Sequence, residues 1–120
     1  MLKKIIIIED DDGIRNLMQI ILEGDGYRVD TFRDFSKKLE NLKEEKSLLF
    51  LVDSYLKNGK DIAKKFKSFS APIILVSARH DIARLAKIGK FTDYLSKPFE
   101  ISELLLKVEK YGKRKHNRKN

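Results

Sequence analysis

The sequence predicts a doubly wound α/β fold, in which helices cover both faces of one parallel sheet of five strands. Two apolar runs that end in acid support this prediction. Residues 5–8 are four isoleucines followed by four acids, and residues 48–52 are apolar and followed by Asp53. Short apolar runs bounded by polar residues are typical of parallel strands buried on both faces. Strand-like and helix-like patterns alternate along the chain, which indicates right-handed β-α-β crossovers.

Five segments have the apolar or alternating pattern of a strand: residues 5–8, 27–32, 48–52, 73–76 and 94–95. Between and after them, apolar residues recur at helical spacing. The residues expected to face the core on these five helices are, in chain order, Ile14, Leu17, Met18, Ile21, Phe35, Leu39, Leu42, Ile62, Phe66, Phe69, Ile82, Leu85, Ala86, Ile101, Leu104, Leu105 and Val108. The pattern therefore predicts five helices.

Local signals predict where these helices begin and end. Residues 24–26 read Gly-Asp-Gly and supply a left-handed stop, so the first helix is expected to end near residue 23. Ser36 and Ser102 are expected to cap the second and the last helix. The third helix is expected to be brief, about two turns over residues 61–69.

The composition excludes several classes of protein. A chain of 120 residues is long enough for one domain with a single core. There is no cysteine, which excludes disulfides, cysteine nucleophiles and cysteine-based zinc sites, and two histidines disfavour a histidine-rich metal site. No stretch approaches the roughly 20 apolar residues that cross a membrane, and the N-terminus lacks a signal-peptide core. We therefore expect a soluble cytoplasmic protein with no membrane contact.

The positive charge of the chain is concentrated at its C-terminus. The net charge is +8, but residues 110–120 hold six Lys or Arg and no acid, so residues 1–109 carry only +2. We expect residues 1–111 to form the domain and residues 112–120 to be a basic tail or the beginning of a linker. A solvated terminus is the preferred interpretation of this tail, and a nucleic-acid contact is the alternative.

Reactive side chains follow the predicted strands. Because the carboxyl ends of parallel strands meet at one edge of a sheet, we expect Glu9, Asp10 and Asp53 to lie close together. Crowded carboxylates repel one another, and a hard divalent cation such as Mg²⁺ relieves this repulsion. Asp53 is then a candidate nucleophile that accepts a phosphoryl group as an acyl phosphate. Lys97 would place an ammonium opposite that group, and the Ser77 hydroxyl would donate to one of its oxygens.

Five motifs occur in order at the ends of the predicted strands: Glu9-Asp10, Asp53, Ser77-Ala78, Tyr94 and Lys97-Pro98-Phe99. As an ordered set, over residues 2 to about 111, they resemble a response-regulator receiver domain of two-component signalling. The resemblance implies a flavodoxin-like fold with strand order 2-1-3-4-5. It also implies a Mg²⁺-dependent phosphorylation of Asp53 by a sensor histidine kinase or a histidine phosphotransfer protein. Such a domain is a signalling module, which catalyses only its own phosphoryl transfer and autodephosphorylation.

The resemblance further implies a role for each residue of the metal site. Mg²⁺ would be held directly by Asp10, by Asp53 and by the backbone carbonyl of Tyr55. Glu9 would act mostly through water.

The same resemblance implies a conformational relay through Ser77 and Tyr94. The hydroxyl would move toward the phosphoryl group, and the aromatic ring would turn inward to fill the vacated space. The output face would be formed by the fourth helix, the fifth strand and the fifth helix. Tyr55 and Arg79 stand at the two positions by which family members tune loss of the phosphoryl group.

Two segments depart from the family pattern. The interval from Asp53 to Ser77 is a few residues shorter than usual, and Lys57 stands where proline is common. Residues 90–94 read Lys-Phe-Thr-Asp-Tyr, where the family tends to have Gly-Ala-Asp-Asp and an aromatic residue, and Phe91 is far bulkier than alanine. We therefore expect the loop after Asp53 and the surface before the fifth strand to have a different shape.

Several site residues also have simpler interpretations. Glu9 and Asp10 would be favourable as acids at the N-terminus of the first helix, although four consecutive acids exceed what the helix dipole needs. The hydroxyl of Ser77 would serve as a helix cap, and Tyr94 would serve as a core aromatic. Asp11 and Asp12 are explained better as acids of the helix N-terminus than as metal ligands.

Two other functions compete with the signalling module. One is a phosphorylation-independent adaptor, or pseudo-receiver, that acts by protein contact. The other is a true enzyme, which is disfavoured because residues 53–55 lack a second Asp and residues 59–61 lack the pattern of a phosphate-binding loop. A downstream effector domain or protein is an expected partner. Nucleic acid is an expected partner only if an effector domain is missing from this chain.

Overall fold

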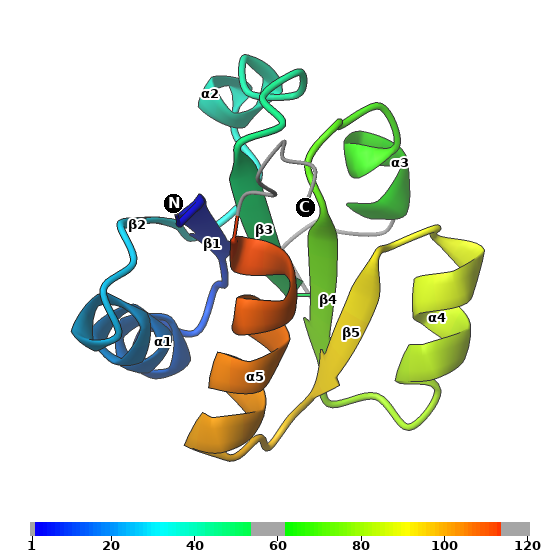
Figure 1. Cartoon of the computed structure of the whole chain (residues 1–120). Coiled ribbons are helices and arrows are strands. Elements are labelled where there is room, and N and C mark those ends of the chain that lie inside the picture. Colours follow the sequence, from blue (N-terminus) through cyan, green and yellow to red (C-terminus); the bar gives the residue numbers. More distant parts are fainter. Residues whose placement is uncertain (1, 54–61, 114–120) are drawn as a thin grey trace, which may run out of the picture.

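The computed structural model describes residues 2–53 and 62–113. It confirms the predicted parallel sheet, with the strands in the order β2-β1-β3-β4-β5 (Figure 1). The strands are β1 (Lys4–Ile8), β2 (Val29–Phe32), β3 (Leu48–Asp53), β4 (Ile73–Ser77) and β5 (Asp93–Ser96). Because all neighbours are parallel, the carboxyl ends of the strands meet at one edge of the sheet, which we call the carboxyl edge.

Five helices in the described residues connect and flank these strands. They are α1 (Asp12–Gly24), α2 (Lys37–Glu40), α3 (Ile62–Phe66), α4 (Ile82–Ile88) and α5 (Ile101–Gly112). Helices α1 and α5 cover one face of the sheet, and α2, α3 and α4 cover the other (Figure 1). The result is the three-layered, doubly wound arrangement predicted from the sequence.

The four isoleucines of β1 fill both layers of the core. Alternate side chains of a strand point to opposite faces. Ile5 and Ile7 pack in the layer under α1 and α5, whereas Ile6 and Ile8 pack in the layer under α2 and α3. Each of the four is at most 1% exposed. A strand that is buried on both faces thus accounts for this unbroken apolar run.

Aromatic rings anchor the short helix α3 to the sheet. The ring centroids of Phe66 and Phe69 lie 4.7 Å apart, and the ring of Phe69 lies 5.4 Å from that of Phe50 on β3. The helix is shorter than the predicted residues 61–69, because it ends at Phe66 and continues as a turn in which the amide of Phe69 bonds to the carbonyl of Phe66. Edge-to-face ring packing, rather than helix length, holds this segment.

Helix α1 begins and ends as its sequence predicts. Asp11 occupies the N-cap, and its Oδ1 accepts a hydrogen bond of 2.8 Å from the amide of Ile14. Asp12 adds a negative charge in the first turn, where the helix dipole favours it. After the helix, Gly26 adopts a φ of 96°, a left-handed conformation that glycine adopts without steric strain.

Helix α5 begins two residues earlier than predicted. Its N-cap is Glu100, whose amide bonds to the Glu103 carboxylate at 2.7 Å, so Ser102 lies inside the helix and is not the cap. Ile101, which was expected in the core, is 57% exposed because it lies at the solvent side of the first turn. Leu17 of α1 was also placed inward and is 49% exposed.

Helix α2 is a single turn of four residues. Ser36 occupies its N-cap position, as predicted, but its side chain makes no cap hydrogen bond. The short helix is held instead by Leu39, which is fully buried.

The two ends of the described chain meet at the edge of the sheet opposite the carboxyl edge. The amide of Lys3 donates to the carbonyl of Gly112, and Leu2 forms an isolated antiparallel bridge with Lys113. Within residues 2–53 and 62–113, no helix has both the length and the apolar character needed to span a membrane.

Two leucines of α5 test the contribution of the core to stability. Leu104 is fully buried against the sheet, whereas Leu106 is 66% exposed. We expect Leu104→Ala to lower the free energy of unfolding by roughly 2–5 kcal/mol, because it removes apolar contacts and leaves a cavity. Leu106→Ala, the matched control, is expected to change it by less than about 0.5 kcal/mol. Urea unfolding measures both values, and equal losses would contradict this placement of α5.

Candidate functional site

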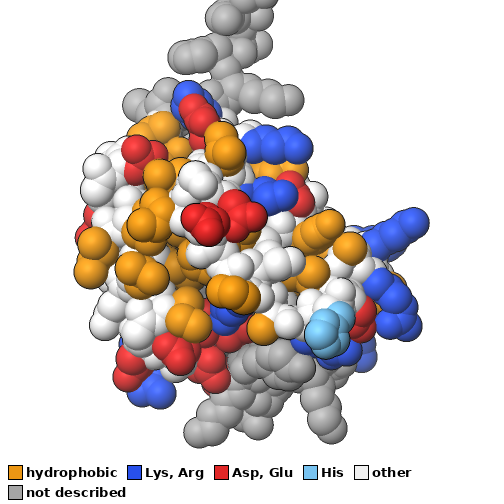
Figure 2. All heavy atoms as spheres, turned by 90° about the horizontal axis from the view of Figure 1, so that it is seen from below, with side chains coloured by type: hydrophobic (Ala, Val, Ile, Leu, Met, Phe, Trp, Pro, Cys, Tyr) orange, Lys and Arg blue, Asp and Glu red, His pale blue; other side chains and the backbone are white. Residues whose placement is uncertain are grey.

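The chemically reactive residues lie at the carboxyl edge because strands deliver them there. Glu9 follows β1, Asp53 ends β3 and Ser77 ends β4. Lys97 follows β5, and its amide bonds to the carbonyl of Ser77 at 2.8 Å. Figure 2 looks onto this edge from below and shows a group of acidic side chains gathered toward one side of it. Four strands separated in sequence therefore bring these side chains together.

Three carboxylates form a cluster at this edge. Glu9, Asp10 and Asp53 each place one carboxylate oxygen within 4.8 Å of those of the other two. Glu9 and Asp53 are 1% and 3% exposed, whereas Asp10 is exposed. Oxygen ligands of this kind, two buried and one open to solvent, fit a hard divalent cation that retains part of its water. The donor set is thus compatible with Mg²⁺.

Lys97 is the positive partner of the two buried acids. Its Nζ lies 2.8 Å from Oε1 of Glu9 and 3.6 Å from Oδ1 of Asp53, and its side chain is 15% exposed. The peptide bond between Lys97 and Pro98 is cis. The ammonium is therefore shared between two carboxylates, with the shorter contact to Glu9.

Burial changes the acidity of Glu9. Removal of its carboxyl from water raises the pKa of Glu9 to about 7, and the adjacent Asp53 carboxylate acts in the same direction. The hydrogen bond from Lys97 and the amide of Asp11 oppose this rise. In the absence of a cation, the cluster therefore takes up a proton at a higher pH than an exposed glutamate does.

Arg15 supports the cluster from α1, and the sequence analysis did not identify it. Its Nη1 donates to the backbone carbonyl of Glu9 at 2.9 Å, and its Nη2 lies 2.6 Å from Oδ1 of Asp12. The side chain of Arg15 is only 13% exposed. The spacing of three residues between Asp12 and Arg15 on one helix is the signal that would have indicated this contact.

Ser77 is buried beside the cluster, and its hydroxyl caps the next segment. Ser77 is 0% exposed, and its Oγ accepts a hydrogen bond of 3.1 Å from the amide of Arg79. The guanidinium of Arg79 turns toward Asp81, with contacts of 3.0 Å and 3.1 Å. Helix α4 begins only at Ile82, so Ser77 does not cap that helix.

Tyr94 lies on β5, away from the acids. It pairs in register with Leu75, and its ring packs in the small core under α4. The Nζ of Lys107 lies 5.6 Å from the centre of this ring and 3.1 Å from Oδ1 of Asp93. The ring is half-buried. Tyr94 therefore occupies the interface between β5, α4 and α5 rather than the site itself.

Tyr55, to which the sequence analysis assigned a metal-binding carbonyl and a role in phosphoryl loss, lies outside the described residues. The structure thus brings together Glu9, Asp10, Asp53, Ser77 and Lys97 at one edge. It places Tyr94 on a neighbouring surface and Arg79 at the rim of the site.

Comparisons with known proteins agree with this geometry. The sequence model of the family described as "Response regulator receiver domain" matches residues 5–109. The chain belongs to this family, and it is a receiver domain of the two-component response regulators. It is therefore a signalling module.

Curated relatives extend well beyond this domain. The chain is 36% identical over 126 residues to the nisin biosynthesis regulatory protein NisR of Lactococcus lactis subsp. lactis, with 100% of this chain and 55% of that protein covered. It is 35% identical over 105 residues to the KDP operon transcriptional regulatory protein KdpE of Escherichia coli, with 83% and 47% covered. The chain spans about half the length of the curated relatives it matches.

Solved structures share the fold. A CheY-like receiver domain protein from Methanospirillum hungatei matches with a TM-score of 0.77 at 25% identity, covering 92% of this chain and 93% of that one. Full-length FixJ from B. japonicum matches with a TM-score of 0.78 at 25% identity, covering 91% and 57%. These matches confirm the flavodoxin-like architecture.

The raised pKa of Glu9 predicts how stability depends on pH. Between 4.5, the ordinary value, and about 7, the folded chain binds more protons than the unfolded chain, so the free energy of unfolding falls as pH rises through this window. In EDTA, we expect this contribution to be about 3 kcal/mol and to disappear in Glu9→Gln.

Urea unfolding at a series of pH values measures this effect. Glu44→Gln changes an exposed carboxylate and serves as the control. Its stability is expected to depend on pH as that of the parent chain does. The assignment is wrong if Glu9→Gln and the parent lose stability equally between these pH values.

Proposed function

We propose that Asp53 accepts a phosphoryl group from a histidine of a sensor kinase or of a phosphotransfer protein. The observation that carries the proposal is the ammonium of Lys97, which lies 2.8 Å from Glu9 and 3.6 Å from Asp53. This arrangement places one positive charge beside the only buried aspartate of the described residues. A carboxylate of this kind is a suitable phosphoryl acceptor.

The proposed reaction is a direct displacement at phosphorus. A carboxylate oxygen of Asp53 forms the new oxygen–phosphorus bond as the phosphorus–nitrogen bond to the donor histidine breaks, and the departing imidazole nitrogen takes up a proton. Lys97 would turn from Glu9 toward an oxygen of the transferred group and neutralise part of its charge. Mg²⁺, held by Asp10, Asp53 and the carbonyl of Tyr55, with Glu9 through water, would neutralise charge on the transferring oxygens.

We propose that Ser77 and Tyr94 relay the change. The Ser77 hydroxyl, which now accepts a bond from the amide of Arg79, would turn to donate to the phosphoryl group. Tyr94 would turn inward toward the space that this movement opens. Because its ring packs between α4 and Lys107 of α5, the movement would alter the face formed by α4, β5 and α5.

The proposed output is carried by a part of the protein beyond this domain. The matched relatives are about twice as long as this chain, and one of them is named DNA-binding response regulator MtrA, from Mycolicibacterium smegmatis. We propose that the receiver extends through Lys113, two residues beyond the expected boundary at residue 111, and that the residues after it begin a linker to an effector domain. Binding of nucleic acid would then be a property of that effector.

Phosphorylation of the intact chain tests the proposal. We expect incubation with acetyl phosphate and Mg²⁺ to add one phosphoryl group to the parent, because Asp53 is the nucleophile, and to add none to Asp53→Asn. Asp30→Asn makes the same change at a half-exposed aspartate of β2 and should be phosphorylated like the parent. Intact-protein mass spectrometry measures the addition.

Two results would contradict the proposal. A phosphoryl group retained by Asp53→Asn would move the acceptor to another residue. No addition to the parent, with acetyl phosphate or with histidine kinases as donors, would favour the phosphorylation-independent adaptor.

Chelation by EDTA is expected to abolish the reaction, and an EDTA-insensitive addition would exclude the proposed role of Mg²⁺.

We also propose that Tyr55 and Arg79 slow the loss of the phosphoryl group by hindering the attacking water. The double variant Tyr55→Ala, Arg79→Ala is expected to lose the group faster than the parent, by roughly threefold or more. Arg84→Ala is the control, because Arg84 also pairs with Asp81 but is 70% exposed. The decay of the phosphorylated mass with time measures these rates, and equal rates for parent and double variant would refute the idea.

A further inference from the structure

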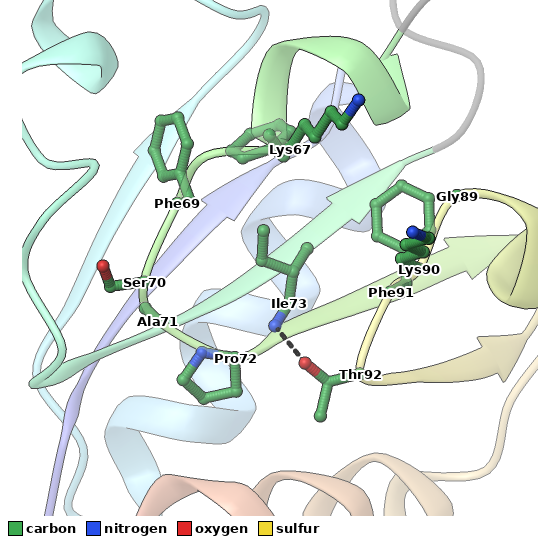
Figure 3. Close-up of a pocket in the computed structure, with 11 residues that line it drawn as sticks. Lys67, Phe69, Ser70, Ala71, Pro72, Ile73, Gly89, Lys90, Phe91 and Thr92 are labelled. Carbon is green, nitrogen blue, oxygen red and sulfur yellow. Dashed lines mark hydrogen bonds between the residues drawn. The ribbon is translucent and has the colours of Figure 1, made fainter.

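A pocket lies at the edge of the sheet opposite the carboxyl edge. It has a volume of about 420 Å³ and lies between the segment that joins α3 to β4 and the segment that joins α4 to β5 (Figure 3). Both segments belong to the regions in which the sequence departs from the family pattern. None of the residues at the carboxyl edge lines this pocket, so it is separate from the site described above.

Three phenylalanines contribute to the walls of the pocket. Phe66, Phe69 and Phe91 line it, and Figure 3 shows the side chains of Phe69 and Phe91 on either side of Ile73. Phe66 is only 3% exposed, whereas Phe69 and Phe91 are half-buried and present part of their rings to the pocket. Phenyl rings favour flat apolar ligands, which stack on their faces or meet their edges.

The rim of the pocket is positively charged. Lys67 and Lys90 line it and are exposed, and no acidic residue lines it. Among residues 2–53 and 62–113, neither lysine lies within 4.0 Å of a carboxylate oxygen. The two ammonium groups are thus available to an anion from solvent.

The backbone at Lys90 is strained. Its φ is 58°, in the left-handed region, and Lys90 is the only residue other than glycine with a positive φ in the described chain. A side chain in this conformation costs on the order of 1 kcal/mol, which glycine would avoid. The chain therefore keeps a cation at the rim at a position where the backbone favours glycine.

We propose that this pocket binds a small, flat aromatic carboxylate. Its rings would lie between Phe69 and Phe91 above Ile73, and its carboxylate would contact Lys67 and Lys90. The volume is in the range of small-molecule sites and exceeds the roughly 150 Å³ that hold one benzene ring, so it accommodates two fused rings with a carboxylate. The ligand would be an input independent of phosphorylation.

Titration of the full chain with 2-naphthoate tests the proposal, with ¹H–¹⁵N NMR shifts as the readout. We expect saturable shifts concentrated at residues 67–73 and 89–92. The neutral 2-naphthamide, which has the same shape, is expected to bind at least about tenfold more weakly, because it lacks the charge that the two lysines recognise.

Charge-matched variants separate recognition from general attraction to a basic protein. Lys67→Gln, Lys90→Gln is expected to weaken binding of 2-naphthoate by about tenfold. Lys37→Gln, Lys38→Gln removes the same charge from the exposed surface of α2 and is expected to leave binding unchanged. Because all four lysines are exposed, the variants should fold like the parent, and thermal unfolding checks this.

Three results would overturn the proposal. These are no saturable shift at millimolar 2-naphthoate, shifts centred on the carboxyl edge rather than on the pocket, and equal affinity in the two double variants. Each of them leaves the proposed phosphorylation of Asp53 intact, because that reaction is measured separately in the absence of the probe.

Discussion

The buried charges at the carboxyl edge set the constraint on which the rest of the structure depends. Glu9 and Asp53 are almost fully removed from water, and one ammonium, from Lys97, lies between them. Two carboxylates and one cation leave an unbalanced negative charge in a region of low dielectric constant. The site is therefore poised to take up a proton or a metal ion, and the scaffold must hold its carboxylates together against their repulsion.

Apolar burial in the parallel sheet holds these carboxylates together. The side chains of β1 and β3 are buried on both faces, and each strand ends at a carboxylate or directly before one. Burial of so many apolar side chains contributes far more free energy than the repulsion of a few charges removes. Helix α1 adds specific support, because Asp11 caps its N-terminus and Arg15 bonds to the carbonyl of Glu9.

The parts of the fold that could be predicted are those that depend on periodicity and on local chemistry. The isoleucine run and the acids that follow it predicted β1, the placement of Asp11 and Asp12 at the N-terminus of the first helix, and the convergence of Asp53 with Glu9. The convergence follows because the direction of parallel strands alone decides which ends meet. The predictions for Ile101 and Ser102 were wrong because a capping pair, Glu100 and Glu103, sets the N-terminus of α5. The helical spacing of apolar residues does not reveal which polar residue is the cap. Arg15 was missed because its spacing from Asp12 indicates only the ion pair between these two residues, whereas its contact with the cluster is to the backbone carbonyl of Glu9.

The pairing of Lys3 with Gly112, and of Leu2 with Lys113, holds the C-terminal end of α5 at the edge of the sheet opposite the carboxyl edge. The 12 residues of α5 separate the end of the described residues from the carboxyl edge by about 18 Å along the helix axis. A module attached after Lys113 would thus be connected at the edge of the sheet opposite the carboxyl edge. A change at the carboxyl edge would then reach such a module through the intervening elements of the fold, such as β5 and α5, and not by direct contact.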